Sequence, residues 1–251
     1  MSDVASNSPA QGSTDDRALA IEQSYWETYE DYDWSSDETK DRAIACIPKL
    51  DGDVLELCIG GGAFARKIPK RYRSYTGVDL SRTLLAALQN RLPHVRAVYG
   101  DAQDLPFGDE EFDVVLLFSG LHHLPDMKKA LAGAFRVLRP GGCFFCFEPN
   151  DRAWYRGVMR FLRDRELIRK MIKIYSDDEV YLDPEKVTEE LLAAGFTDVR
   201  VDFMTARFNP EFLGFMNRIF ASVLYTAGRF GSGMRSQSYF ALSARKPAAD
   251  L

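Results

Sequence analysis

Short apolar runs alternate with segments of helical periodicity through the first two thirds of the chain. Each apolar run has the length of a buried strand, and the run 112–118 is apolar except at Asp113, as in a strand covered on both faces. The expected strands cover 54–59, 75–80, 95–99, 112–118 and 143–148, and the expected helices between them cover 64–72, 82–91 and 127–138. Strand–helix–strand units at this spacing predict right-handed crossovers and a parallel sheet with helices on both faces.

Two further strands and several further helices are expected outside this region. Residues 184–194 predict a helix that ends at Gly195, and 198–203 and 237–244 predict the sixth and seventh strands. Helices are also expected at 17–34, 36–47 and 212–224. The predicted fold is therefore α/β: a Rossmann-like, doubly wound, seven-stranded and mostly parallel sheet, with helical additions over the cleft.

The domain organisation follows from the same pattern. Residues 1–16 are rich in Ser, Asn, Gly and Asp and predict a disordered tail rather than a signal peptide, because they lack a basic start and an apolar middle. Residues 17–246 are expected to form a single domain with an inserted helical cover at 151–180 and 210–230, and 247–251 to form a second tail. No apolar run approaches the ~20 residues of a membrane span, so we expect a cytoplasmic protein.

Charge narrows the choice of partners. A formal net charge of −5 argues against nucleic acid as the main partner. The segment 151–174 runs against this trend, with eight basic and three acidic residues. It could pair internally, attract an anionic acceptor or make transient contact with an acidic membrane surface. The apolar helix at 212–224 could pack in the core, line an apolar acceptor pocket or form a dimer face, so a monomer and a homodimer both stay open.

The four cysteines predict no metal site. Cys143 and Cys146 form a C-x-x-C within an expected strand, where residues three apart point to opposite faces. A shared metal ion is therefore not expected. Buried free thiols are the better interpretation.

Three glycines, Gly60 to Gly62, follow the first strand and precede a helix. This arrangement lets a ligand approach the backbone closely and places unpaired N–H groups beside it, which favours a nucleotide-like cofactor. Acidic residues stand at the ends of the first three strands: Glu56, Asp79 and Asp101. In parallel sheets the ligand lies at the carboxyl ends of the strands, where Asp79 suits a ribose diol and Asp101 an exocyclic amine. Each acid could instead simply cap a helix, and a nicotinamide dinucleotide would also fit the glycines and Asp79.

The chain resembles the class I S-adenosylmethionine-dependent methyltransferases. The residues that carry the resemblance lie in the family's order and spacing at 54–62, 77–81, 100–107, 112–115, 121–126 and 136–142. Asp101 and the segment 136–142 belong to this pattern and have no required place in dinucleotide-binding proteins. The resemblance therefore favours S-adenosylmethionine as the cofactor and S-adenosylhomocysteine as its product.

The resemblance also implies a set of cofactor contacts. Glu56, Gly60 and Gly62 would flank the methionine part, Asp79 the ribose hydroxyls and Leu80 one face of the adenine. The adenine edge would meet Asp101 and Ala102, and Phe118 and Ser119 would pass beneath the sulfonium. Tyr25, in the aromatic helix 17–34, is expected to contact the cofactor if that helix acts as a lid rather than as a surface helix. The chain departs from the family at Cys58, where glycine is usual and a Cβ could crowd the turn.

Methyl transfer needs a base only when the acceptor must lose a proton. His122 and His123 follow the fourth strand, and Glu148 ends the fifth, from where it could orient His123. The alternative is that one histidine caps a helix or packs structurally. We therefore expect a methyltransferase of a small, natural-product-like or apolar molecule, with oxygen as the acceptor atom. Carbon or nitrogen methylation of an aromatic or quinone-like acceptor, and a non-catalytic cofactor-binding subunit, are the alternatives.

Overall fold

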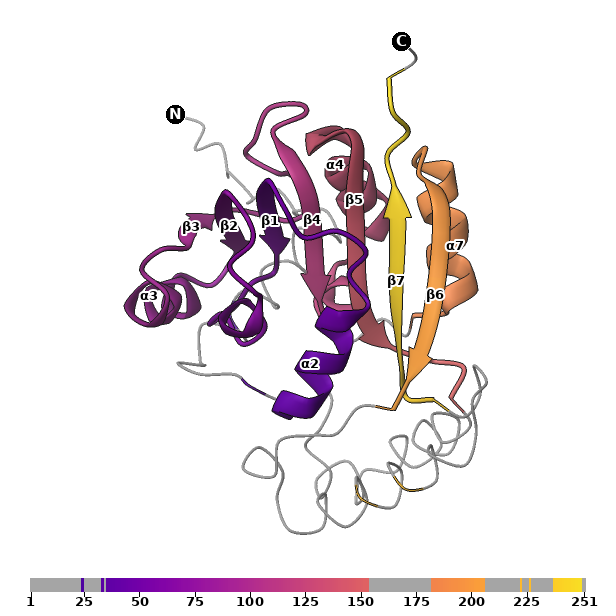
Figure 1. The fold of residues 1–251 in the computed structure, drawn as a ribbon, viewed down its shortest axis with the longest axis horizontal. Helices are drawn as coiled ribbons and strands as arrows, with labels where there is room; N and C mark the ends of the chain where they lie inside the picture. Colours follow the sequence, from indigo (N-terminus) through magenta and orange to yellow (C-terminus); the bar gives the residue numbers. More distant parts are fainter. Residues whose placement is uncertain are drawn as a thin grey trace, which may run out of the picture.

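The computed structural model describes residues 24, 33, 35–153, 182–205, 222, 226 and 237–249. They form one seven-stranded sheet in the order β3-β2-β1-β4-β5-β7-β6 (Figure 1). The strands are β1 (Asp53–Leu57), β2 (Ser74–Asp79), β3 (Arg96–Tyr99), β4 (Phe112–Phe118), β5 (Leu138–Pro149), β6 (Thr197–Met204) and β7 (Tyr239–Arg245). Strands β1 to β5 pair in parallel, and β7 pairs antiparallel with both β5 and β6. The predicted doubly wound, mostly parallel sheet is confirmed.

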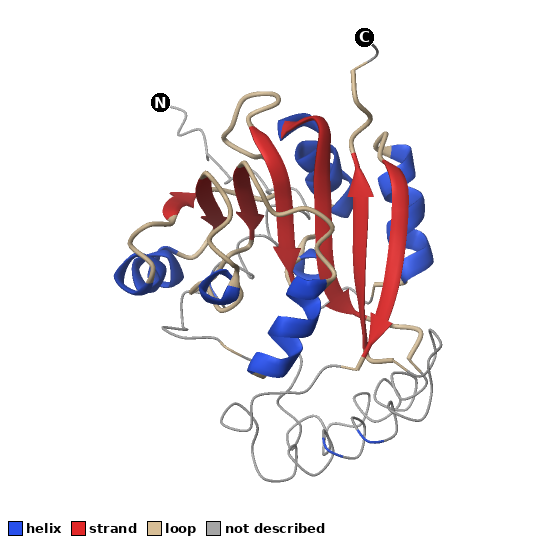
Figure 2. Cartoon of the chain, viewed as in Figure 1, coloured by secondary structure: helices blue, strands red, loops and turns tan. Residues whose placement is uncertain are grey.

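Helices cover both faces of the sheet (Figure 2). The α-helices are α2 (Asp37–Ala45), α3 (Arg82–Arg91), α4 (Met127–Val137) and α7 (Pro184–Ala193), and two 3-10 turns are η1 (Ala65–Lys67) and η2 (Leu121–His123). Buried side chains of α4 and α7 share one apolar cluster with the sheet, whereas those of α2, η1 and α3 share the other. The two clusters lie on opposite faces because successive strand residues alternate between them: Val54 belongs to one and Leu55 to the other.

The helix starts follow the capping signals of the sequence. Ser36 Oγ accepts the backbone N–H of Thr39 at 3.3 Å, and Ser81 Oγ accepts that of Leu84 at 3.2 Å. These bonds satisfy backbone donors that a helix leaves unpaired at its first turn. Both predicted helix starts are confirmed.

One predicted helix is wrong. Residues 64–72 contain only the 3-10 turn η1, which ends before Ile68. Ile68 precedes Pro69 and has extended backbone angles, φ −63° and ψ 124°. The proline ring disfavours a helical conformation in the residue before it, and this is why the apolar periodicity did not become an α-helix.

Several predictions lie outside the described residues. These are the tail 1–16, the position of Tyr25, most of the inserted cover at 151–180 and nearly all of 210–230. The single-domain organisation stays a prediction. Among the helices that the structure does describe, none is both long and apolar enough to cross a membrane.

Candidate functional site

Asp79 joins the ends of two neighbouring strands. It is the last residue of β2, and its Oδ2 accepts the backbone N–H of Gly60, in the turn after β1, at 2.8 Å. Its Oδ1 accepts the N–H of Ser81 at 2.8 Å, at the start of α3. The carboxylate thus holds the glycine turn beside the start of α3, at the edge of the sheet where a ligand is expected. A carboxylate has about four lone-pair sites, which is enough to accept hydrogen bonds besides these two.

Two glycines of the turn have left-handed backbone angles, with φ +54° at Gly60 and +79° at Gly62. A Cβ on Gly62 would lie 2.6 Å from Leu88 Cδ1, so this glycine allows α3 to pack closely. Among the described residues, a Cβ on Gly60 would have only Leu84 Cδ1 within 4 Å, at 3.8 Å. The surroundings of Gly60 therefore leave room for a ligand, and its N–H is already directed by Asp79.

Cys58 adopts the left-handed conformation that glycine usually provides, with φ +53°. Its side chain fits because Gly120, after β4, has none: a Cβ on Gly120 would lie 2.6 Å from Cys58 Cβ and 3.1 Å from Sγ. Sequence reasoning missed this partner. The pKa of the Cys58 thiol is raised well above its usual range by burial and then by four nearby carboxylates: Asp79, Glu148, Asp101 and Glu56. The charges of the acids at the strand ends therefore all act on this thiol, and their role in holding a cofactor stays a prediction.

Glu56 is the most deeply buried of the three predicted acids. Its side chain comes from β1, the residue is 2% exposed, and Oε2 accepts the hydroxyl of Tyr75. The pKa of Glu56 is raised to about 8, mainly by burial; the hydrogen bond from Tyr75 opposes this shift and the nearby charge of Asp79 adds to it. A bound cation would favour the ionised form of this carboxyl group.

A pH dependence of stability follows from this pKa. Glu56 and Glu148 both have pKa values raised from 4.5 to about 8 by burial in the folded protein. Below about pH 4.5 both carboxyls are neutral whether the chain is folded or unfolded, so their stabilising contribution is complete. Between about pH 5 and about pH 8 the folded state binds more protons, so the melting temperature of the cofactor-free protein should fall as pH rises. Thermal melts should show a shallower fall for Glu56→Gln, and a flat or rising wild-type curve would contradict this assignment.

Asp101 closes the turn after β3. Its Oδ1 accepts the N–H of Gln103 at 2.8 Å, and the Gln103 side-chain amide lies 3.3 Å from both carboxylate oxygens. Gln103 Oε1 in turn accepts the N–H of Asp126 at 2.7 Å, at the start of α4. The chain of contacts links the loops after β3 and β4. Beside it, Ala102 is buried and Leu80 is half-buried.

The end of β4 forms an apolar floor with one unsatisfied hydroxyl. Phe118 stacks on Phe64, with ring centroids 4.2 Å apart and an interplanar angle of 11°. Ser119 has a left-handed φ of +52°, and its N–H donates to Phe147 O at 2.8 Å. Ser119 Oγ is buried and has no hydrogen-bond partner in the part of the chain that the structure describes. Backbone strain of this kind together with an unpaired polar atom is typical of a binding site.

Glu148 holds the turn that carries both histidines, but it contacts His122 rather than His123. Its Oε1 accepts the N–H groups of Gly120 at 3.0 Å and Leu121 at 2.8 Å, and its Oε2 lies 2.7 Å from His122 Nδ1. The predicted orientation of His123 by Glu148 is therefore wrong. The 3-10 turn η2 directs consecutive side chains differently, so His122 turns inward while His123 is half-buried, with the two ring centroids 4.0 Å apart.

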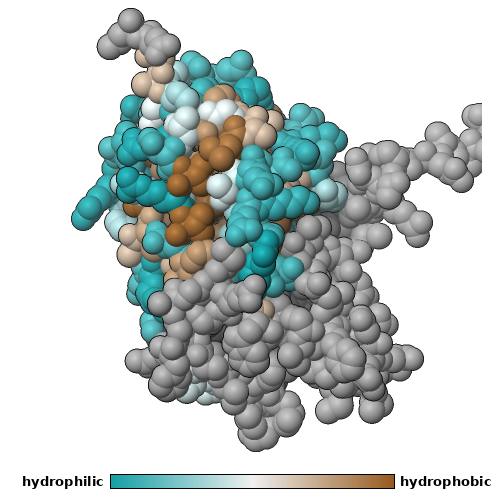
Figure 3. Space-filling view, turned by 90° about the vertical axis from the view of Figure 1, so that its right-hand side faces the viewer, coloured by the Kyte–Doolittle hydropathy of each residue, from teal (hydrophilic) through white to brown (hydrophobic). Residues whose placement is uncertain are grey.

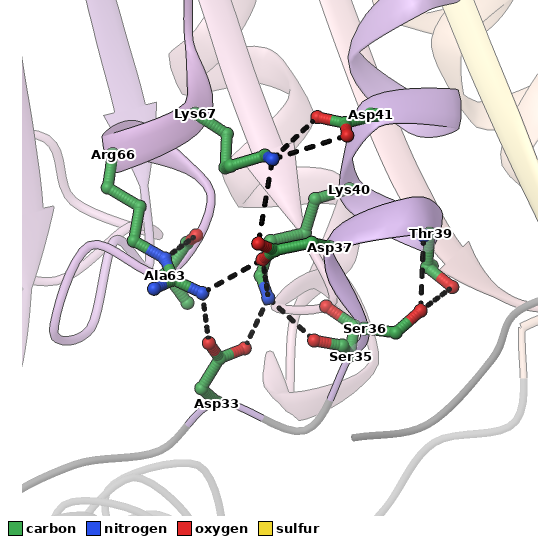
Figure 4. Close-up of polar contacts among 10 residues, drawn as sticks. All are labelled: Asp33, Ser35, Ser36, Asp37, Thr39, Lys40, Asp41, Ala63, Arg66 and Lys67. Carbon is green, nitrogen blue, oxygen red and sulfur yellow. Dashed lines mark hydrogen bonds and ion pairs between the residues drawn. The ribbon is translucent and has the colours of Figure 1, made fainter. Parts of the chain in front are cut away.

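Lys40 and Asp33 belong to a network of ion pairs that connects the segment before α2 to the chain after the glycine turn (Figure 4). Lys40 is 1% exposed; its Nζ donates to Ser35 O at 2.6 Å and pairs with Asp33 at 2.7 Å. Asp33 also pairs with Arg66 of η1 at 2.6 Å, and Arg66 Nε donates to Ala63 O at 3.2 Å. These ion pairs and the bond to Ala63 O form a brace that holds the chain directly after the glycine turn. Sequence reasoning missed them because a helical lysine is normally solvated.

The two cations of this brace should differ in their contribution to stability. Lys40→Met keeps the side-chain bulk but removes the buried ammonium group from Asp33 Oδ1 and Ser35 O, and should lower the free energy of unfolding by about 2 kcal/mol. Arg66 is 47% exposed, so Arg66→Ala should lower it by less than about 1 kcal/mol. Urea unfolding of both variants checks the difference, and equal losses would contradict a buried role for Lys40.

A small cavity lies between the glycine turn and the end of α3. Its lining consists of Asp33, Gly61, Gly62, Ala63, Arg66, Arg91 and Leu92. None of the four carboxylates around Cys58 is among these residues. Gly62, a predicted cofactor contact, lines this cavity, whereas Asp79 and Asp101, which are expected to hold the ribose and the adenine, do not.

Comparisons with known proteins agree with this geometry. Residues 55–146 match the family model described as a methyltransferase domain. The chain is 44% identical over 132 residues, 48% of its length and 49% of the relative's, to a phthiotriol/phenolphthiotriol dimycocerosates methyltransferase of Mycobacterium tuberculosis. It is 32% identical over 121 residues, 43% of its length and 49% of the relative's, to the ubiquinone/menaquinone biosynthesis C-methyltransferase UbiE of Rickettsia bellii. The chain thus spans about half the length of these curated relatives.

The fold extends beyond the matched segment. The crystal structure of an S-adenosylmethionine-dependent methyltransferase of Thermotoga maritima, described as a possible histamine N-methyltransferase, superposes with a TM-score of 0.60. The superposition covers 92% of this chain and 93% of that one at 18% identity. At this identity the likeness shows the shared fold alone.

Proposed function

We propose that the chain is a class I S-adenosylmethionine-dependent methyltransferase that transfers the cofactor's methyl group to a small apolar acceptor. The observation that carries this proposal is the Asp79 carboxylate, which holds the turn at Gly60 and the start of α3 at the carboxyl end of β2, within the segment that matches the methyltransferase model. Asp79 with Glu56 nearby favours a cationic ligand, because a bound cation would shift Glu56 toward its ionised form. The positive ammonium and sulfonium groups of S-adenosylmethionine suit this set of charges.

The residues at the site fit this cofactor. Asp79 would accept the ribose hydroxyls, in addition to the N–H groups that it already holds, and Asp101 with Ala102 would meet the adenine edge beside Leu80. Glu56 and Gly60 would flank the methionine part. Phe118 and Ser119 would form the floor beneath the sulfonium, where the buried Ser119 Oγ lacks a partner among the described residues. We also propose that Tyr25 contacts the bound cofactor, with helix 17–34 acting as a lid.

The cofactor supplies an activated methyl group, so the protein's task is to align the acceptor and exclude water. We assign proton removal from an acceptor hydroxyl to a ring nitrogen of His123. Glu148 and His122 act as positioning residues, because their contact at 2.7 Å and the two N–H bonds to Glu148 fix the turn that carries His123. A base held this way would raise the nucleophilicity of an oxygen acceptor.

Oxygen is the acceptor atom that a histidine base supports best. The Mycobacterium relative supports an apolar hydroxylated acceptor, since its name contains a triol. The UbiE relative supports the second candidate, carbon methylation of a quinone-like acceptor, because its name describes a C-methyltransferase. A non-catalytic cofactor-binding subunit is the remaining alternative.

Two measurements separate these functions. Isothermal titration with S-adenosylmethionine and with NAD tests the cofactor, and tight NAD binding without S-adenosylmethionine binding would contradict the proposal. Transfer of labelled methyl to lipid-like alcohols and to reduced quinones then tests the acceptor.

On a hydroxylated acceptor, His123→Ala should lower kcat at least about 100-fold. His94 is an exposed histidine before β3, and the control variant His94→Ala should leave kcat unchanged. Full turnover by His123→Ala would contradict the assignment of His123 as the base. If the wild-type protein turned over none of the acceptors, the non-catalytic alternative would be favoured.

A further inference from the structure

The outer edge of β6 is open in the described structure. β6 is the last strand in the sheet order, so only its inner edge pairs, with β7. It lies at the right-hand end of the sheet in Figure 1, next to α7. The view onto this side shows an apolar band between hydrophilic surfaces (Figure 3). An edge strand with free backbone groups can pair with another strand.

The side chains of β6 divide into two rows. Val199, Val201 and Phe203 are half-buried and pack against the apolar cluster that includes α4 and α7. Arg200 and Asp202 stand on the opposite face and are exposed. Neither forms an ion pair with any residue that the structure describes, although they carry opposite charges on neighbouring positions of the same face.

This row pattern is complementary to itself in one antiparallel register. If Val201 faces Val201 of a second copy across a two-fold axis, Arg200 faces Asp202 and Val199 faces Phe203, each pair occurring twice. Residues directly opposite in an antiparallel pair lie on the same face of the sheet, so the charged pairs and the apolar pairs form separate rows. We propose that β6 pairs with β6 of a second copy of this chain, which makes one continuous sheet through an isologous interface.

Features at the ends of β6 limit this pairing to its middle. The register with β7 shifts between Thr197 and Arg200, and Asp198 has a left-handed φ of +53°. Such a bulge bends the strand away from a straight neighbour.

The expected interface is small. Leu192 at the end of α7, the helix that contacts β6, is 54% exposed and adds apolar surface. Five paired residues bury less than the roughly 1,600 Å² of a standard interface, so we expect a weak dimer with a micromolar Kd. The inference goes beyond the proposed function and does not depend on it.

Sedimentation equilibrium from about 1 to about 200 µM tests the proposal directly. The wild-type chain should form dimers. Arg200→Asp would place like charges opposite each other twice and should weaken dimerisation at least about tenfold. Arg200→Asp combined with Asp202→Arg exchanges the two charges and should restore it. Arg71→Asp, with the same charge change on an exposed residue before β2, is the matched control and should have no effect.

Each other outcome overturns the proposal. A wild-type chain that stays monomeric at the highest concentration excludes the dimer. A dimer that Arg200→Asp leaves intact uses another surface, and failure of the charge exchange to restore dimerisation excludes this register. Binding of S-adenosylmethionine measured on the same variants should be unchanged, so a failure here is distinguishable from a failure of the proposed function.

Discussion

Asp79→Ala is expected to weaken binding of S-adenosylmethionine by about 100-fold or more. The carboxylate accepts the N–H groups of Gly60 and Ser81 at 2.8 Å each, and we propose that it also accepts the ribose hydroxyls. Its loss removes two charge-assisted bonds that order the glycine turn as well as the direct contacts, and each such bond contributes about 1.5–3 kcal/mol. Isothermal titration measures the affinity.

Two further variants sharpen this result. Asp79→Asn keeps one acceptor oxygen and should lie between wild type and Asp79→Ala. Asp104→Ala removes an exposed carboxylate in the loop after β3 and should leave the affinity unchanged. Unchanged affinity in Asp79→Ala, with a wild-type melting temperature, would exclude Asp79 from the cofactor site.

Glu148→Ala is expected to lower the free energy of unfolding by about 3 kcal/mol or more. The residue is fully buried, and its removal leaves the N–H groups of Gly120 and Leu121 and the ring of His122 without their shared partner. Unsatisfied buried donors cost about 1–3 kcal/mol each, partly offset where water enters the space left by the side chain. Urea unfolding measures the loss.

The conservative variant separates stability from positioning. Glu148→Gln keeps the volume and one acceptor oxygen, so most of the protein should stay folded at 25 °C. If Glu148 positions the histidine turn, Glu148→Gln should lower kcat on the true acceptor much more than it weakens cofactor binding. Equal effects on both would indicate a general loss of structure, and wild-type stability of Glu148→Ala would contradict the buried contacts.

Local patterns predicted much of the fold and the positions of the acids. Continuous apolar runs such as 114–118 occur in strands covered on both faces, and parallel pairing brings the carboxyl ends of β1, β2 and β3 to one edge. Asp79 and Asp101 could therefore be placed near each other from their spacing alone. The 3-10 turn in place of helix 64–72 is also encoded locally, because the effect of Pro69 on Ile68 outweighs the helical periodicity of the segment.

Contacts between distant residues could not be predicted in this way. The partner of Glu148 depends on how β4 and β5 are registered and on the way that η2 turns its two histidines, neither of which is visible in a local pattern. The fit of Cys58 depends on the absence of a side chain at Gly120. Lys40 is buried only because Asp33 and Ser35 surround it.

A crystal structure of the protein with S-adenosylhomocysteine tests the central claim most directly, namely that the carboxyl ends of β1 to β4 form one cofactor site. The account predicts the ribose hydroxyls on the Asp79 carboxylate, the adenine beside Asp101 and the sulfur above Phe118 and Ser119. A ligand bound instead in the cavity lined by Asp33, Arg66 and Arg91, with Asp79 contacting only Gly60 and Ser81, would contradict it.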